Sequence, residues 1–504
     1  MNGKFSFAGL SIILAMLSAC GGGSDSNSSS APPSGTTTDT LGNTGATSSA
    51  GGGRPGNVAG FVYAVNRQSN NLTGYEIDTT TRALTAIPGS PFAAGDEPVA
   101  ITVNPNDRFL YVPNASSRNV SAYSIDHATG ALSAVAGSPY AVGGPYPWGP
   151  GVTLYRAPSS VSIEPSGKFA YVVAGGDYGG SQGVAVPLLI PGQIWAFSID
   201  ATTGAWTPVS GSPYDVHNNR LPLTFDRQGK FAYASSSASN AYNDIPRAGI
   251  ISTFAIDTTS GALVQVGEPV VTAGSNQTPV SIHPSGKFAY IASDAGMASF
   301  SINPGTGTLS SIDSLHGLTR TPYHTVRIDP SGKFVYASNY DTDRNQNGIA
   351  AFTIDASSGR LSEVAGSPYH VGMEYLIPSA PYPVTIDPSG KFVYMGTGGT
   401  FFCAVLVPCT SEFEPGKIWA YTIDAATGVL SAVAGSPFAI DNEPLSITID
   451  PSGKAAYVLS KGSDGRGNWI VAYTLNAATG ALTQIGSYPQ GNNPVALVIA
   501  GTAP

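Results

Sequence analysis

The sequence predicts an all-β protein, a single closed β-propeller of eight four-stranded blades. Two short sequence elements each recur eight times. The composition suits strands joined by tight turns, because the 504 residues include 61 glycines and 39 prolines while only 11% are charged. The innermost-strand pattern that the first copy lacks follows the last copy, at 494–499. The N-terminal and C-terminal strands should therefore share one blade. Seven blades are the alternative count.

Residues 1–20 predict a lipoprotein signal peptide. Lys4 supplies a positive charge, and the apolar run from Phe5 to Leu17 is too short to cross a membrane as a helix. Leu17-Ser18-Ala19-Cys20 then resembles the bacterial lipobox, in which the cysteine is lipidated. We expect export and a lipid anchor on Cys20, and Gly21 favours the outer membrane. An ordinary signal peptide that is cut elsewhere is the alternative.

Residues 21–57 predict a disordered tether, because Gly, Ser, Thr and Asn offer almost nothing to bury. As a flexible coil of roughly 37 residues, it would reach on the order of 35 Å. The propeller is then expected over 58–504.

The first repeated element is an alternating apolar strand followed by Asp-Pro-Ser-Gly-Lys-Phe-x-Tyr. Aspartate caps the turn, proline presets φ, and glycine accepts the unusual dihedral angles at its end. Seven copies end at Tyr111, Tyr171, Tyr233, Tyr290, Tyr336, Tyr394 and Tyr457, and a shortened eighth ends at Tyr63. Each copy predicts the first two strands of a blade.

The second repeated element reads aromatic-x-Ile-Asp, then Thr-Gly-Ala-Leu, and often Gly-Ser-Pro-Tyr. Its copies begin at Tyr75, Tyr123, Phe197, Phe254, Phe300, Phe352, Tyr421 and Tyr473. It predicts the third and fourth strands, with the aspartate accepting hydrogen bonds from its own turn. We therefore interpret the repeated aspartates as structural and not as acid–base pairs.

Length variation is confined to two kinds of connection, from strand two to strand three and from one blade to the next. The longest are 172–193, 234–249 and 395–417 within blades, and 141–157 and 370–382 between blades. Both kinds leave an antiparallel blade at the same face. Because function on a rigid scaffold usually lies on irregular loops, we expect the site on this face, around the central channel.

Candidate ligand-binding residues lie in the inter-blade connections. Arg156, Arg220 and Arg320 each stand two residues before a proline, and His217, His324 and Trp148 lie in the same kind of segment. If the arginines converge, they suit a carboxylate or phosphate. Separate solvated loop side chains are the alternative.

Two further loops carry candidate sites of other kinds. Asp341, Asp343 and Asn345 alternate oxygen-bearing side chains as calcium loops do, although Gln346 stands where an EF-hand needs glycine. A plain polar loop is the alternative there. Cys403 and Cys409 predict a small local disulfide, because an exported protein meets oxidising conditions.

The repeats, with Pro-Ser-Gly-Lys-Phe-x-Tyr followed by aromatic-x-Ile-Asp and Thr-Gly-Ala-Leu, resemble the β-propeller lactonase family over about 61–500. That family has YVTN-type repeats and includes 6-phosphogluconolactonase and the fungal muconate lactonising enzymes. The resemblance implies the propeller fold and a hydrolase acting on lactones. The family is best known with seven blades, so the predicted eighth puts its pocket geometry in doubt.

One segment resembles the family's histidine-bearing blade. Thr321-Pro322-Tyr323-His324 precedes Asp329-Pro330, and Asp343-Arg344 follows. The resemblance implies His324 as the catalytic histidine, and in a lactone hydrolase we expect Arg320 to bind an anionic substrate. Pro322 stands where the family has its first histidine, and no glutamate follows near Tyr394 in the next blade. The implied acid–base set is incomplete.

Three functions remain open. The first is a binding or scaffold module of the cell envelope that holds a protein, a glycan or a small anionic ligand on its loop-rich face. The second is a lactone hydrolase acting on an anionic sugar lactone, and the third is a structural or adhesive surface propeller. None requires a cofactor, apart from the calcium considered above. The formal net charge of −9 argues against nucleic acid as a partner.

Overall fold

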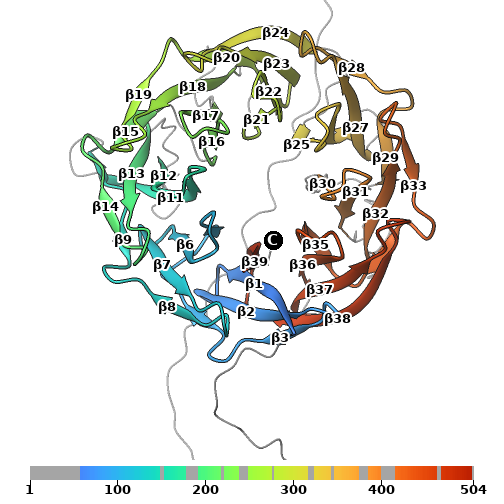
Figure 1. Ribbon diagram of the computed structural model, residues 1–504, viewed down its shortest axis with the longest axis horizontal. Coiled ribbons are helices and arrows are strands. Elements are labelled where there is room, and N and C mark those ends of the chain that lie inside the picture. Colours follow the sequence, from blue (N-terminus) through green and yellow to red (C-terminus); the bar gives the residue numbers. More distant parts are fainter. Residues whose placement is uncertain are drawn as a thin grey trace, which may run out of the picture. The chain divides into compact units, whose positions relative to one another are not determined.

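A computed structural model describes residues 57–147, 153–176, 191–216, 221–237, 248–274, 277–315, 323–341, 346–373, 384–398, 415–462 and 467–501. Within these ranges the chain forms strands and turns and no helix. Consequently, this part of the chain offers no helix that could cross a bilayer. The strands form eight antiparallel sheets arranged in a ring (Figure 1). The predicted eight-bladed propeller is confirmed.

Each blade runs outward from the channel to the rim in strand order. The strands of blades 1 to 4 have the following bounds: blade 1, β39 (Pro494–Ala500), β1 (Val58–Asn66), β2 (Asn71–Asp78), β3 (Leu84–Ala86) and β4 (Phe92–Ala93); blade 2, β5 (Thr102–Val103), β6 (Phe109–Asn114), β7 (Asn119–Ile125), β8 (Leu132–Ala134) and β9 (Tyr140–Ala141); blade 3, β10 (Pro145–Pro147), β11 (Thr153–Ile163), β12 (Phe169–Gly176), β13 (Gly192–Ile199), β14 (Trp206–Pro208) and β15 (Tyr214–Val216); blade 4, β16 (Thr224–Phe225), β17 (Phe231–Ser237), β18 (Ala248–Ile256), β19 (Leu263–Gln265) and β20 (Val270–Ala273).

Blades 5 to 8 repeat this plan. Their strands have these bounds: blade 5, β21 (Ser281–Ile282), β22 (Phe288–Ser293), β23 (Gly296–Ile302) and β24 (Leu309–Leu315); blade 6, β25 (Tyr323–Ile328), β26 (Phe334–Asp341), β27 (Gln346–Ile354), β28 (Leu361–Glu363) and β29 (Tyr369–Met373); blade 7, β30 (Val384–Ile386), β31 (Phe392–Thr397), β32 (Gly416–Ile423), β33 (Leu430–Ala432) and β34 (Phe438–Ile440); blade 8, β35 (Glu443–Ile449), β36 (Ala455–Lys461), β37 (Asn468–Leu475) and β38 (Leu482–Gln490).

The C-terminal strand β39 completes blade 1. It pairs antiparallel with β1, with Val62 opposite Ile499 and Tyr63 opposite Val498. Figure 1 shows β39 beside β1 on the channel side of this blade. The prediction that the two chain ends share one sheet is confirmed. Closing the ring in this way leaves no blade without neighbours.

The fourth strand is not continuous in most blades. In the five blades that contain Gly-Ser-Pro, this tripeptide divides the strand into two short pieces that both pair with the third strand. The serine side chain bridges the gap, as in blade 2, where Ser138 Oγ accepts a hydrogen bond of 2.8 Å from the Ala122 backbone amide. Interrupted rim strands offer a poor template for pairing with other chains.

The core lies between neighbouring blades, and its most regular feature is the tyrosine that ends the first repeated element. All eight copies are fully buried. In seven of them the hydroxyl donates to a backbone carbonyl in the strand 3–4 turn of the next blade, as Tyr290 does to Gly359 at 3.0 Å. In blade 2 the Tyr111 hydroxyl is buried without a hydrogen-bond partner, and the Tyr111 ring packs on Trp206, which replaces the usual leucine.

The same packing between blades explains why the Thr-Gly turn needs its glycine. In seven of the eight blades a phenylalanine of the second strand packs directly on the glycine of the next blade, so that a Cβ on Gly261 would overlap the ring of Phe169. Gly261 also has a φ of 77°, which favours glycine. Seven of the eight strand 3–4 turns use this Phe–Gly pair.

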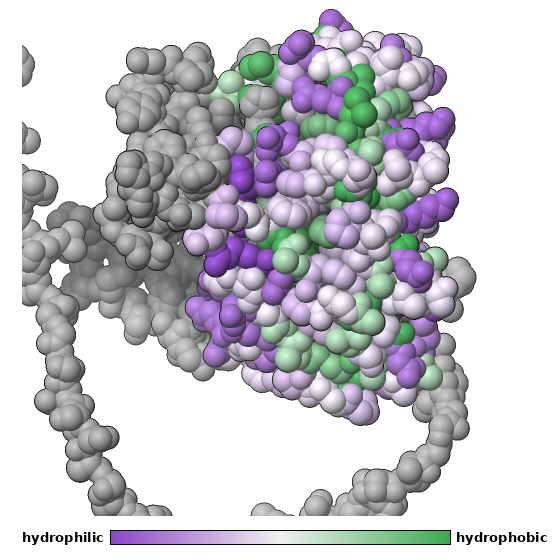
Figure 2. All heavy atoms as spheres, turned by 90° about the vertical axis from the view of Figure 1, so that its left-hand side faces the viewer, coloured by the Kyte–Doolittle hydropathy of each residue, from purple (hydrophilic) through white to green (hydrophobic). Residues whose placement is uncertain are grey.

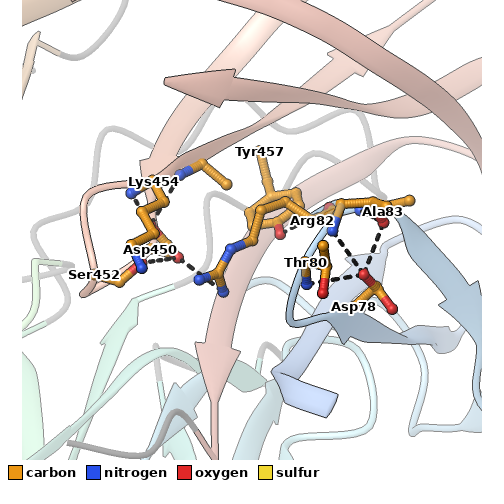
Figure 3. Close-up of polar contacts among 10 residues, drawn as sticks. Asp78, Thr80, Arg82, Ala83, Asp450, Ser452, Lys454 and Tyr457 are labelled. Carbon is orange, nitrogen blue, oxygen red and sulfur yellow. Dashed lines mark hydrogen bonds and ion pairs between the residues drawn. The ribbon is translucent and has the colours of Figure 1, made fainter. Parts of the chain in front are cut away.

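The eighth pair, at the seam between blades 8 and 1, is different. Ala455 replaces the phenylalanine and Arg82, with a φ of 61°, replaces the glycine. The Arg82 guanidinium reaches back to Asp450 of blade 8 at 3.5 Å, and the Arg82 carbonyl accepts the hydroxyl of Tyr457 at 3.1 Å (Figure 3). A large residue on blade 1 thus replaces glycine where a small residue on blade 8 replaces phenylalanine, and this exchange marks the place where the ring closes.

The aspartates of both turns are structural, as predicted. In the Asp-Pro-Ser-Gly turn, Asp329 Oδ1 accepts the Phe334 amide at 2.7 Å. In the Thr-Gly turn, Asp257 Oδ1 accepts the amides of Thr259 and Ser260 at 2.8 and 3.0 Å. Hydrogen bonds within the turn lower the pKa of Asp257. These carboxylates are engaged by their own backbone and are not available as acid–base pairs.

The ring therefore has two unlike faces. The turn face carries the Asp-Pro-Ser-Gly and Thr-Gly turns. The loop face carries the connections between strands two and three and between blades, because antiparallel pairing brings both to the opposite edge. Figure 2 shows part of the outer side, where strongly hydrophilic residues gather toward the two faces and weakly polar and apolar ones lie between them.

Candidate functional site

Most of the residues singled out from the sequence lie outside the described part of the chain. These are Cys20, Trp148, His217, Arg220, Arg320, Asp343, Asn345, Cys403 and Cys409. The predicted lipid anchor, disulfide and cationic cluster therefore remain predictions. Among the described residues, no group of three or more histidine, cysteine, aspartate or glutamate side chains is placed to hold a metal ion.

Three predicted residues belong to described strands. Asp341 ends β26, and its side chain is not described. His324 lies in β25, the innermost strand of blade 6, at a shift of register between Tyr323 and Thr325. Such β-bulges re-aim side chains and are frequent beside active sites. The same shift in blade 3 falls at Ser159, between Pro158 and Ser160.

Arg156 is buried in β11, with only 6% of its surface exposed. Its Nε donates to the carbonyl of Pro191 at 2.8 Å, immediately before β13. Its backbone amide donates to Gly144 at 3.3 Å. Arg156 thus connects β11 to the chain segments that precede and follow it. These contacts fit a role for Arg156 in positioning the backbone of the loop face.

The described part of the loop face holds a cavity of about 450 Å³ at blades 1 to 3. We call it the loop-face cavity and define it by six of its lining residues: Arg67, Glu97, Ser116, Arg118, Tyr155 and Ser159. They come from the strand 2–3 turns of blades 1 and 2, the connection between these blades, and β11 of blade 3. The volume is in the range of small-molecule sites.

A carboxylate is held on one wall of this cavity. Glu97 Oε1 accepts Arg67 Nη2 at 3.3 Å, and Glu97 Oε2 accepts the hydroxyl of Ser116 at 2.6 Å. Arg67 and Glu97 are both nearly half exposed, so the pair contributes only about 0–1 kcal/mol to stability. The Arg67 side chain can therefore exchange this partner for another anion at small cost.

A second arginine lies on an aromatic ring in the same cavity. The Arg118 guanidinium carbon is 3.8 Å from the centroid of the Tyr155 ring, a cation–π contact. Tyr155 is 41% exposed, which is unusual among the large hydrophobic side chains that the structure describes. Stacking fixes the guanidinium plane while its edge, which carries the N–H donors, stays available for a planar anion.

The backbone around the cavity is strained. Asn70, Glu97 and Arg118 have φ values of 53°, 53° and 52°, although none is glycine. Asn70 Oδ1 stabilises one of them by accepting the Glu97 amide at 2.9 Å. Residues held in the left-handed region cluster at ligand sites, because the surrounding structure must maintain them.

Sequence reasoning missed these residues because it looked for function in the long loops. Arg67 and Arg118 lie in short strand 2–3 turns, where nothing in the length of the connection attracts attention. A signal was nevertheless present: these turns carry arginine, whereas the equivalent turn of blade 5 is only Asp294-Ala295.

Comparisons with known proteins agree with the observed propeller fold, although the description of the matching family counts seven blades and this ring has eight. The model of the family described as "Lactonase, 7-bladed beta-propeller" matches residues 37–146, 190–296, 283–396 and 380–499. A candidate 6-phosphogluconolactonase from Bacteroides uniformis has a TM-score of 0.50 at 14% identity, covering 87% of this chain and 99% of its own. Another, from Bacteroides fragilis, has a TM-score of 0.50 at 15% identity, with 90% and 100% covered. No curated protein sequence matches this chain significantly.

Proposed function

This chain belongs to the lactonase family of β-propellers, and from that premise we propose that it is a binding protein of the cell envelope that holds a small anion in the loop-face cavity. The observation that carries the proposal is the pair of arginines, Arg67 and Arg118, on the wall of one cavity. An organic carboxylate is the class of ligand that matches two planar guanidinium groups.

Binding would exchange one carboxylate for another. The ligand takes the place of Glu97 on Arg67 and accepts N–H donors from the edge of Arg118. The ring of Tyr155 holds Arg118 in place, and Ser116 keeps a partner in Glu97. The rest of the lining is small, because Ala157, Pro158 and Ser159 form the blade 3 wall.

The test is calorimetric titration of the full-length chain with gluconate. Arg67→Ala and Arg118→Ala should each weaken binding by about tenfold or more, the usual effect of losing a charge-assisted hydrogen bond. Arg227→Ala is the matched control, because Arg227 is an exposed arginine in an Asp-Arg-Gln-Gly turn on the turn face. Equal affinities for Arg118→Ala and Arg227→Ala would overturn the proposal.

Lactone hydrolysis is the second candidate, and the position of His324 favours it. Its backbone lies in an innermost strand at the bulge whose counterpart in blade 3, Ser159, lines the loop-face cavity. A histidine side chain can take a proton from water as a general base. Hydrolysis of gluconolactone by the full-length chain should then fall by at least about a hundredfold in His324→Ala. Equal rates would exclude this chemistry.

The anchor is part of the same proposal. Lipid on Cys20 and a tether over 21–57 would hold the propeller at a membrane surface, with the outer membrane favoured by Gly21. Labelled palmitate should be incorporated into the wild-type chain and not into Cys20→Ser. A membrane-bound Cys20→Ser protein would contradict the anchor.

A further inference from the structure

A second cavity, of about 350 Å³, lies on the loop face between blades 7 and 8. We call it the rim groove and define it by six lining residues: Asp441, Asn442, Ser460, Trp469, Gln484 and Ser487. Asp441 and Asn442 belong to the connection between the two blades, and Gln484 and Ser487 to the outermost strand β38. The groove shares no lining residue with the loop-face cavity.

The walls of the rim groove are fixed by hydrogen bonds. Asn442, only 3% exposed, donates from Nδ2 to the carbonyl of Gly467 at 3.0 Å. Ser460 Oγ donates to the carbonyl of Trp469 at 3.1 Å. The indole is thereby placed at the start of β37, and it is only partly buried there.

The polar groups of the groove are neutral or acidic. Gln484 Nε2 donates to Ser487 Oγ at 3.2 Å, and the Asp441 side chain is exposed. Among the lining residues that the structure describes, none is cationic. A ligand with hydroxyl groups suits this set, because a carboxylate accepts hydroxyl hydrogens and an amide both donates and accepts.

An independent observation is the hydroxyl of Tyr473. Tyr473 is 2% exposed, and its hydroxyl is buried without a hydrogen-bond partner. In β37 it lies on the same side as Val471 and Trp469, and it stands opposite Gln484 in β38. Burial, with the nearby charge of Asp441, raises the pKa of Tyr473.

Of the three equivalent tyrosines elsewhere in the ring, two have a satisfied hydroxyl, Tyr75 and Tyr123. Tyr75 donates to the carbonyl of Pro489, and Tyr123 donates to that of Ala93, in each case on the outer strand of the preceding blade. A buried hydroxyl without a partner costs about 1–3 kcal/mol, so such groups call for an explanation. In blade 8 the side chain of Tyr473 lies on the side of β37 that also carries Trp469 and Val471, two lining residues of the groove.

We propose that the rim groove binds one sugar unit of a neutral glycan, with Trp469 packing on the ring and Asp441, Gln484 and Ser487 bonding its hydroxyl groups. A sugar ring offers an apolar face of C–H groups and an edge of hydroxyls, which matches an aromatic side chain flanked by convergent polar groups. The site goes beyond the proposed anion binding and depends on none of its residues.

The experiment is saturation-transfer NMR and calorimetry of the full-length chain with maltotetraose, cellotetraose and the tetramer of N-acetylglucosamine. At least one should bind, with a Kd on the order of 1 mM. Gln484→Ala should weaken that binding by about tenfold. The matched control is Gln265→Ala, since Gln265 stands opposite Phe254 in blade 4 as Gln484 stands opposite Tyr473 in blade 8.

Trp469→Ala should abolish binding, and Gln484→Ala, at an exposed position, covers the case in which the tryptophan variant does not fold. Arg118→Ala should leave glycan binding unchanged, which separates this site from the loop-face cavity. The proposal is overturned if none of the three oligosaccharides binds, or if Gln484→Ala and Gln265→Ala bind equally well.

Discussion

The seam between blades 8 and 1 allows a quantitative test of how the ring closes. The perturbation is to rebuild it as the other seven interfaces are built, with Ala455→Phe and Arg82→Gly. At those interfaces a phenyl ring occupies the space that a Cβ on glycine would need, as Phe392 does beneath Gly480. At the seam the glycine position holds Arg82, which has a Cβ, and the phenylalanine position holds Ala455, which is fully buried.

Each single change should destabilise the protein. Ala455→Phe forces a ring against the Arg82 Cβ, and overpacking of this kind costs about 1–3 kcal/mol. Arg82→Gly removes the ion pair to Asp450, whose side chain is only 3% exposed. Asp450 keeps its hydrogen bonds from Ser452, Lys454 and Ala455, so we expect a loss of about 1–2 kcal/mol in the free energy of unfolding. Relief of the positive φ at Arg82 should offset part of this loss.

The double variant should recover most of the loss, because phenylalanine then packs on glycine. Additive effects would give about 3 kcal/mol, whereas we expect the double variant to lie within about 1 kcal/mol of wild type, a coupling energy of about 2 kcal/mol. The assay is urea unfolding of the full-length chain, followed by fluorescence. An additive double variant would show that Arg82 and Ala455 do not form a complementary pair.

Three further predictions concern the repeated interactions. Tyr290→Phe removes the hydroxyl that donates to Gly359 and should lower the free energy of unfolding in urea by about 1–2 kcal/mol. Tyr111→Phe, which removes a hydroxyl buried without a partner, should lower it clearly less. A larger effect for Tyr111→Phe would contradict the role of the tyrosine hydroxyl in joining neighbouring blades. Gly261→Ala should destabilise the protein by about 3 kcal/mol or more, because the new Cβ overlaps Phe169. Gly286→Ala, at a similar φ of 72° but with open space around the Cβ, should destabilise it by only about 1 kcal/mol. Equal losses of stability would mean that the backbone dihedral angle, and not the packing on phenylalanine, requires glycine. The hydrogen bonds of its turn lower the pKa of Asp257 in the folded protein, so the contribution of this carboxylate to stability is present above about pH 4 and lost as the pH falls. The urea midpoint of Asp257→Asn should therefore depend less on pH than that of the wild type between about pH 5 and pH 2. The same pH dependence in both proteins would refute the structural role of Asp257.

The sequence alone determined the architecture, because the architecture is repeated in it. Each turn is specified locally by residues such as aspartate, proline and glycine at set positions. Eight repetitions of these turn sequences predict eight blades. The split module, with its missing strand at 494–499, was enough to predict that β39 would join β1. Local hydrogen bonds likewise explained the repeated aspartates without any tertiary contact.

Only the tertiary structure decided which residues lie together. Arg67 and Arg118 are 51 positions apart in the numbering, and no pattern in the chain links them to Tyr155 in a third blade. The exchange of Arg82 and Ala455 is also invisible as a pair until the ring brings blades 8 and 1 into contact. The repeats encode the contacts within each blade. A site instead depends on residues that depart from the repeat and come from different blades, and ring closure and packing decide which of these residues lie together.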